Sequence, residues 1–197
     1  MKWSARSALP PIPSHAVVTQ AAVDAAERTF SDSDDLETSI DDAFSRFDDE
    51  QPALAAFLIS EFEAQRDETA QALGYFLSVC VHEAFRRAFG ERLGAAEPST
   101  VELAKASLEL DESMRREDAT EPFESDDVVA MQQPHVMAFV REQIDSVLSP
   151  DDEQDVERDV DVDSVSAVYH ALLVCILALS RAVRPSRGDE SSRRMLS

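Results

Sequence analysis

Residues 51–90 read QPALAAFLISEFEAQRDETAQALGYFLSVCVHEAFRRAFG and contain two amphipathic helical patterns joined by a short polar link. Pro52 suits the first turn of a helix, because proline lacks the N–H that this position leaves unused. Gln51, which precedes the proline, is driven away from helical backbone angles. Residues 71–89 then hold 12 apolar residues out of 19, and Gly90 is typical of a helix end. The stretch predicts an antiparallel helical hairpin.

A second stretch, residues 133–184, repeats this pattern in a degraded form. The paired positions include Gln51 with Gln133 and Pro52 with Pro134 at an offset of 82, and Cys80 with Cys175 at an offset of 95. The difference of 13 residues falls in an acidic segment around 150–163. Neither hairpin can cover its apolar face alone, so we expect their second helices to pack together. Genuine duplication and the coincidence of two amphipathic hairpins both stay open.

The rest of the chain favours helix over sheet, because glycine turns and alternating β-branched residues are scarce. Further helices are expected over 14–30, 36–47, 99–116 and 127–132. In the third of these, Val101, Leu103, Leu108, Leu110 and Met114 are expected to form one buried stripe. The prediction is an all-α helical bundle of about six to seven helices built around the two pseudo-repeated hairpins. Its parts are a flexible N-terminal arm (1–13), a single all-helical domain (14–184) and a disordered C-terminal tail (185–197).

Charge restricts the classes of partner. The chain carries 40 acidic and 18 basic residues, for a formal net charge of -22. Such a surface repels nucleic-acid phosphates and anionic lipid headgroups, so neither a nucleic acid nor a membrane is expected as a partner. A basic protein would be attracted. A salt-rich or GC-rich source is the alternative explanation of the acidity.

Cysteine usage and the apolar segments favour a cytoplasmic protein. Cys80 and Cys175 stand within apolar blocks, which predicts buried, inert thiols and not a disulfide framework. The N-terminus lacks the apolar core of a secretory signal. Residues 165–183 are strongly apolar, but the uninterrupted run 171–179 is too short for a membrane span and predicts a buried core helix.

Four polar residues stand within the apolar helices and are the candidates for a site: His82, Glu83, Tyr169 and His170. A di-iron bundle would need Glu-x-x-His, which this chain lacks. Asp159, Asp161 and Asp163 have the spacing of a calcium loop. However, Ser164 replaces its glycine and His170 its bidentate glutamate. No catalytic, cofactor-binding or metal residue is therefore assigned, and no cofactor is expected.

The sequence favours a non-enzymatic acidic protein that binds another protein, as an adaptor, a regulator or a sequestering, immunity-type partner of a basic protein. One alternative is a bundle that binds a small molecule or a metal through the four polar residues, with or without enzymatic activity. Another is a subunit of a larger assembly, a homo-oligomer included. No motif identifies the partner.

Overall fold

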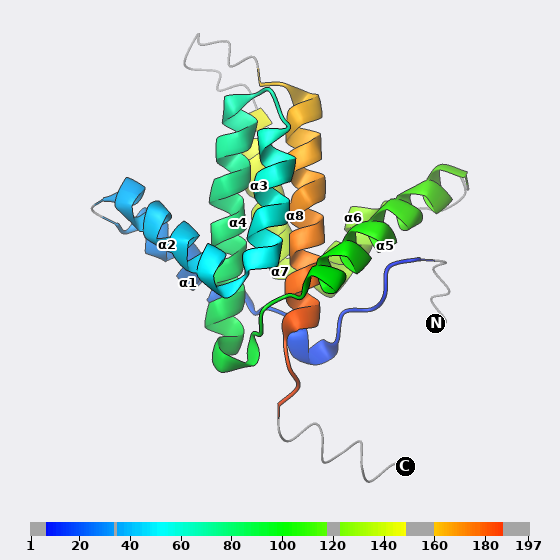
Figure 1. The fold of residues 1–197 in the computed structure, drawn as a ribbon, viewed down its shortest axis with the longest axis horizontal. Helices are drawn as coiled ribbons and strands as arrows, with labels where there is room; N and C mark the ends of the chain where they lie inside the picture. Colours follow the sequence, from blue (N-terminus) through cyan, green and yellow to red (C-terminus); the bar gives the residue numbers. More distant parts are fainter. Residues whose placement is uncertain (1–6, 34, 118–122, 149–159, 187–197) are drawn as a thin grey trace.

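The computed structural model describes residues 7–33, 35–117, 123–148 and 160–186 (Figure 1). This part of the chain forms eight α-helices, with 3-10 turns at Ser14–Ala16 and Gly90–Arg92. The helices are α1 (Gln20–Ser31), α2 (Leu36–Glu50), α3 (Pro52–Glu63), α4 (Glu68–Phe89), α5 (Pro98–Glu117), α6 (Ser125–Gln132), α7 (Pro134–Leu148) and α8 (Val162–Ala182).

The all-α prediction is confirmed, but six to seven helices was too few. The short helix α6 forms as a separate element because a capping box stabilises its N-terminus. Glu124 accepts from the backbone at the third helical position, and the Asp127 side chain accepts from the Glu124 N–H. At the start of α2, Asp35 is the N-cap, and its side chain accepts from the Thr38 N–H.

Helices α4 and α8 lie side by side at the centre and pack against each other along their lengths (Figure 1). Helices α1 and α2 pack on α4 and project to one side, while α5 and α6 pack on α8 at the other. Helix α3 contacts both central helices. Helix α4 lies this close to α3 and α8 because residue 74 is a glycine. A Cβ at this position would lie 2.9 Å from the Phe62 ring and 3.0 Å from Val168.

The first hairpin follows its local signals closely. Helix α3 begins at Pro52, and α4 ends at Phe89, where Gly90 has a φ of 52°. Helix α4 starts at Glu68, a few residues before the expected 71, because the Asp67 carboxylate accepts from the backbone N–H groups of Thr69 and Ala70.

Gln51, between α2 and α3, is buried and ties down a distant connection. Its Nε2 donates to the Gly94 carbonyl at 2.9 Å, and its Oε1 accepts from the Ala96 N–H at 2.8 Å. Both partners lie in the segment that leads into α5. The side chain thus satisfies backbone groups that no helix satisfies.

Gln133, between α6 and α7, does the same for the segment that leads into α1. Its Nε2 donates to the Ala16 carbonyl at 2.6 Å and to the Ser180 hydroxyl at 2.9 Å. Its Oε1 accepts from the Val18 N–H at 3.0 Å, and the whole residue is 0% exposed.

The second predicted hairpin, 133–184, differs from the first in its packing. Helix α3 packs against α4, which follows it directly, whereas the main neighbours of α7 are α1, α4 and α6. The pseudo-repeated arrangement therefore stays a prediction.

The limits of the domain also stay predictions. Residues 1–6 and 187–197 of the expected arm and tail lie outside the described residues. Residues 7–13 of that arm contact the helices: Leu9 is buried, and the Ala8 N–H donates to Asp111. Among the described helices, α8 alone is long and apolar enough to cross a membrane, and 67% of its most apolar window is buried inside the protein.

Candidate functional site

The four polar candidates fall into two separate places. Tyr169 and His170 lie on α8 at a pocket, whereas His82 and Glu83 lie on α4 against α2. The structure therefore does not unite them in one site.

The pocket lies between α5, α6 and α8 and has a volume of about 480 Å³. Its lining is mostly polar and charged: Glu112, Arg115, Arg116, Glu124, Ser125, Asp126, Ser166, Tyr169, His170 and Leu173. The carboxylates come from α5 and α6 and the aromatic groups from α8. Such a lining can hold a polar ligand by hydrogen bonds, although most of its charged groups already have partners within the protein.

On the α8 side of the pocket, Tyr169 belongs to a network with Arg141 of α7. The Tyr169 hydroxyl donates to Asp126 at 2.9 Å and accepts from Nε of Arg141 at 3.2 Å. Arg141 also donates to Asp126 and Asp127, at 2.6 and 3.0 Å. Burial raises the pKa of Tyr169 to about 12 despite the nearby guanidinium, so the phenol stays protonated and acts as a donor.

His170 faces α5 across the pocket. Its Nε2 lies 3.3 Å from Oε1 of Glu112, and both side chains are about 30% exposed, at 32% and 28%. A partly exposed polar contact of this kind contributes little to stability and leaves both groups accessible from solvent.

Beneath this pocket, Asp111 is a buried acceptor that sequence patterns did not single out. Its carboxylate is 0% exposed and accepts from Nε of Arg115, the Ser125 hydroxyl, the Ser7 hydroxyl and the Ala8 N–H, all within 2.7 Å. Burial opposes ionisation, but these donors outweigh it and lower the pKa of Asp111. The residue joins α5, α6 and the N-terminal segment.

Glu83 occupies the second place and is surrounded by arginines. It is 3% exposed and lies 2.8 Å from both Arg86 and Arg87, with Arg46 of α2 at 3.6 Å. Burial disfavours the carboxylate, yet the hydrogen bonds and charges of the arginines lower the pKa of Glu83 overall. The buried carboxylate of Glu83 is thus fully paired with arginines of the protein itself, which fits a structural role.

His82, next to Glu83, is a buried neutral histidine. It is 2% exposed, and its ring packs 4.9 Å from the Phe47 ring. Nε2 lies 3.3 Å from Oε2 of Glu50, but it has no hydrogen-bond partner among the described residues. Burial is the main cause that lowers the pKa of His82 to about 4.

The protein should lose stability on mild acidification through His82. The folded-state pKa of about 4 lies below the ordinary 6.5, so the unfolded chain binds the proton first. The contribution is present above pH 6.5 and is lost as pH falls from 6.5 toward 4. Between pH 7 and pH 5 this loss is about 2 kcal/mol. Urea unfolding at both pH values measures it: the free energy of unfolding should fall by this amount more in wild type than in His82→Gln.

His135→Gln serves as the matched control for that measurement. It removes a histidine from α7 and leaves His82 in place, so it should keep the loss of stability that His82 causes. An equal acid response in His82→Gln and wild type would show that His82 is not the cause.

Of the aspartates with calcium-loop spacing, Asp161 is the N-cap of a helix. Asp161 caps α8 by accepting from the Ser164 N–H, and its own N–H donates to Asp67. Asp159 lies outside the described residues. Over the part of the chain that is described, no three His, Cys, Asp or Glu side chains gather as metal ligands do.

Both thiols are free and buried, and burial raises the pKa of Cys80 and of Cys175. A protonated, enclosed thiol is a poor nucleophile.

In comparisons with known proteins, no protein-family model, no curated protein and no solved structure matches this chain.

Proposed function

We propose that the chain acts by binding another protein, and that a basic amphipathic helix of that protein docks along the exposed side of α5. The observation that carries this proposal is a stripe of uncovered apolar side chains on α5. Leu103, Leu110 and Met114 are 55%, 56% and 38% exposed. We call these three residues the α5 stripe.

The members of the α5 stripe share one side of the helix. Their spacings of seven and four residues are close to whole helical turns, so their side chains follow one another along the axis. The expectation that they are buried was wrong, because Val101, Ala104 and Leu108 take the core-facing positions instead. Among the described residues, the other large exposed apolar side chains are spread over four helices: Leu36, Met131, Leu148 and Val162.

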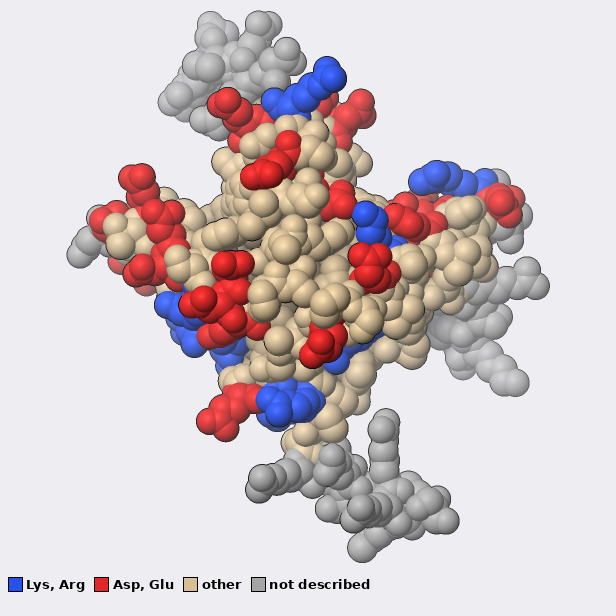
Figure 2. All heavy atoms as spheres, viewed as in Figure 1, with Lys and Arg blue, Asp and Glu red and all other residues tan. Residues whose placement is uncertain are grey.

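The acidic residues that border the α5 stripe indicate that the partner is positively charged. Glu102, Glu109 and Glu117 are exposed on the same helix, and acidic side chains are spread over much of the face seen in Figure 2. A net charge of -22 adds a long-range field of the same sign. Leucines bordered by carboxylates suit a helix with an apolar face and a lysine-rich border.

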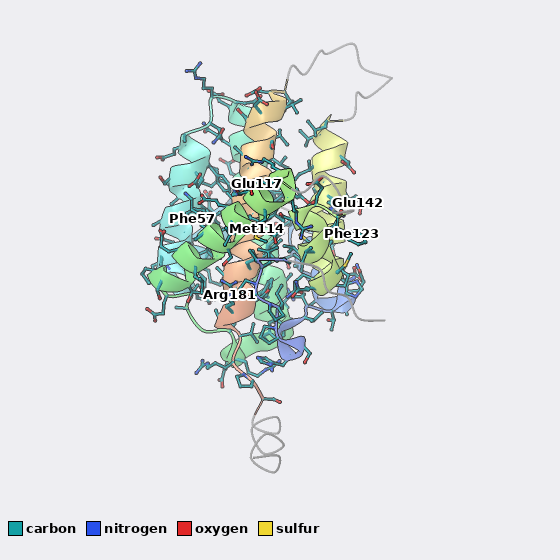
Figure 3. All side chains as sticks on the ribbon, turned by 90° about the vertical axis from the view of Figure 1, so that its right-hand side faces the viewer. Phe57, Met114, Glu117, Phe123, Glu142 and Arg181 are labelled. Atoms are coloured by element: carbon teal, nitrogen blue, oxygen red, sulfur yellow. The ribbon has the colours of Figure 1, made fainter. Side chains whose placement is uncertain are left out.

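The position of α5 makes the stripe accessible. Helix α5 runs outward from the central helices, and Figure 3 shows Met114 and Glu117 toward its outer end. A partner helix can therefore lie alongside α5 without displacing the core helices.

A leucine–lysine peptide with helical periodicity tests the docking face. We expect it to bind the wild-type protein, while a leucine–glutamate peptide of the same period does not, because its charges are repelled. Leu110→Ser should weaken binding about tenfold, since covering the exposed half of this leucine contributes about 1.4 kcal/mol. Fluorescence anisotropy with labelled peptides measures all three affinities.

Leu36→Ser is the matched control, since Leu36 is 49% exposed on α2, away from the stripe. Equal losses in Leu36→Ser and Leu110→Ser, or equal binding of the two peptides, would contradict the proposal. A concentration-dependent dimer that Leu110→Ser abolishes in sedimentation would assign the stripe to a second copy of the chain instead.

We also infer that the two halves of the chain are diverged copies of one four-helix unit, which extends the repeat beyond the hairpins. Gln51 and Gln133 support this, because each lies before a helix-starting proline and holds a distant connection by two backbone groups. The packing partners agree: α1 lies on α4 as α5 lies on α8, and α2 meets α3 as α6 meets α7.

A polar ligand in the pocket is the second candidate function, and the meeting of Tyr169 and His170 there supports it. A thermal-shift screen of small polar metabolites tests it, with Ser166→Trp to fill the pocket. A ligand whose stabilising effect disappears in Ser166→Trp would favour this candidate, and an unchanged effect would place the ligand elsewhere.

A further inference from the structure

Arg181, in the last turn of α8, is partly buried, and its guanidinium has no counter-charge among the described residues. Its Nη1 and Nη2 atoms each expose less than 1 Å² and have no hydrogen-bond partner among the described residues. Burial accordingly lowers the pKa of its guanidinium. Figure 3 places Arg181 on the lower part of α8. Leaving a buried charge unpaired costs free energy, so this position calls for a partner.

Other partly buried arginines of the protein do have carboxylate partners. Arg86 and Arg87 pair with Glu83, and Arg115 pairs with Asp111 at 2.6 Å. The chain has 40 acidic residues to draw on. Within the part of the chain that the structure describes, the lack of a carboxylate at Arg181 is therefore a particular feature of this position and not a general shortage of acids.

The first half of the chain shows what Arg181 lacks. The alignment of Cys80 with Cys175 also pairs Arg86 with Arg181. Arg86 makes two hydrogen bonds, of 2.8 and 3.0 Å, to Glu83 three residues earlier. The residue three before Arg181 is Ala178, which is fully buried and has no side-chain oxygen that could accept from the guanidinium.

Two more arginines lie at this end of α8, Arg184 just after the helix and Arg92 from the turn after α4, and the carboxylates of the described residues pair with neither. Arg184 donates to the Glu91 backbone carbonyl at 2.8 Å. Arg92 lies 5.2 Å from the centre of the Phe89 ring and donates to the Arg184 carbonyl at 3.5 Å. The end of α8 is thus locally positive on an acidic protein, which draws anions toward Arg181.

We propose that Arg181 is an anion site that takes a small carboxylate. The two Nη atoms of a guanidinium match the two oxygens of a carboxylate, and this bidentate pair is among the strongest hydrogen-bonded contacts. The ligand has to be small, because both nitrogens are enclosed and entry depends on side-chain movement. The site lies on α8 and is independent of the α5 stripe.

Acetate is the probe. We expect the melting temperature of the full chain to rise by about 3 °C when sodium acetate at about ten times its Kd replaces sodium chloride at equal ionic strength. Arg181→Met should lose this rise. In acetate-free buffer, Arg181→Met should melt no lower than wild type, because an apolar residue replaces an unpaired buried charge.

Arg28→Met is the charge-matched control, because Arg28 is exposed on α1. It corrects for the general stabilising effect of acetate, and it should keep the full rise. A rise of equal size in Arg181→Met and Arg28→Met would overturn the proposal. So would a markedly lower melting temperature of Arg181→Met without acetate, which would show that Arg181 already has native partners.

A spectroscopic readout tests the contact directly. The side-chain Nε–H resonance of Arg181, identified by its loss in Arg181→Met, should shift and saturate with acetate. A resonance that acetate leaves unmoved would overturn the assignment. A response to inorganic phosphate as large as that to acetate would overturn the choice of a carboxylate.

Discussion

Replacing Asp111 by alanine is expected to lower the free energy of unfolding by about 4 kcal/mol, the largest single effect foreseen for this protein. The carboxylate is fully buried and accepts four hydrogen bonds. Alanine would leave the Arg115 guanidinium without its buried counter-ion, and the hydroxyls of Ser7 and of the buried Ser125 would lose an acceptor. Urea unfolding at pH 7 measures the change.

The position of Asp111 explains why one side chain has such an effect. It lies on α5, receives Ser125 from the first turn of α6, and holds Ser7 and Ala8 of the N-terminal segment. Three parts of the chain separated by up to 104 residues therefore depend on one carboxylate. Loss of Asp111 should also loosen the floor of the pocket, which Arg115 and Ser125 line.

Graded variants separate this explanation from a general effect of charge. Ser7→Ala removes one donor and should cost about 1 kcal/mol. Asp48→Ala removes an exposed carboxylate from α2 and should change stability by less than about 0.5 kcal/mol. If Asp111→Ala cost no more than Asp48→Ala, the buried network would not be a source of stability.

The first hairpin was predictable because its signals are local. Pro52 and Gly90 act on their own backbone, and the apolar pattern between them depends on positions a few residues apart. The boundaries of α3 and α4 consequently fall within a few residues of those expected. Helix α6 was also visible in the sequence, but its independence depended on the capping by Glu124 and Asp127.

The candidate site was predictable only in part, because pairing between distant residues leaves no local pattern. Tyr169 and His170 stand out as polar residues in an apolar helix, and both do line the pocket. Their partners Arg141 and Glu112 look like ordinary surface charges of α7 and α5. Asp111 resembles the other acidic residues of α5 until Ser7 and Ser125 are brought to it.

At the α5 stripe, a local pattern predicted burial that the structure does not show. Leu103, Leu110 and Met114 were expected in the core because apolar residues at helical spacing usually are. Helix α5 has more apolar positions than one buried face needs, and the core uses Val101, Ala104 and Leu108. Periodicity indicates that an apolar face exists, but the neighbouring helices decide which of two adjoining faces is covered.

Gln133→Ala is expected to destabilise the protein by about 3 kcal/mol, and Gln51→Ala by somewhat less. Each buried polar group left without its partner costs about 1 kcal/mol or more. Gln133 serves three groups, the Ala16 carbonyl, the Val18 N–H and the Ser180 hydroxyl. Gln51 serves two, the Gly94 carbonyl and the Ala96 N–H. Denaturant unfolding of both variants measures the order.

The comparison of the two glutamines also bears on the proposed duplication. If both halves inherited the same glutamine contact from one ancestral unit, each variant should be destabilised at the connection that its glutamine holds. Hydrogen exchange should then quicken at Val18 in Gln133→Ala and at Ala96 in Gln51→Ala, because these N–H groups lose their acceptor. Gln20→Ala, on the exposed surface of α1, is the control and should leave both amides protected. Fast exchange at Val18 in the wild type would show that Gln133 does not hold this connection, and the two glutamines would then not be equivalent.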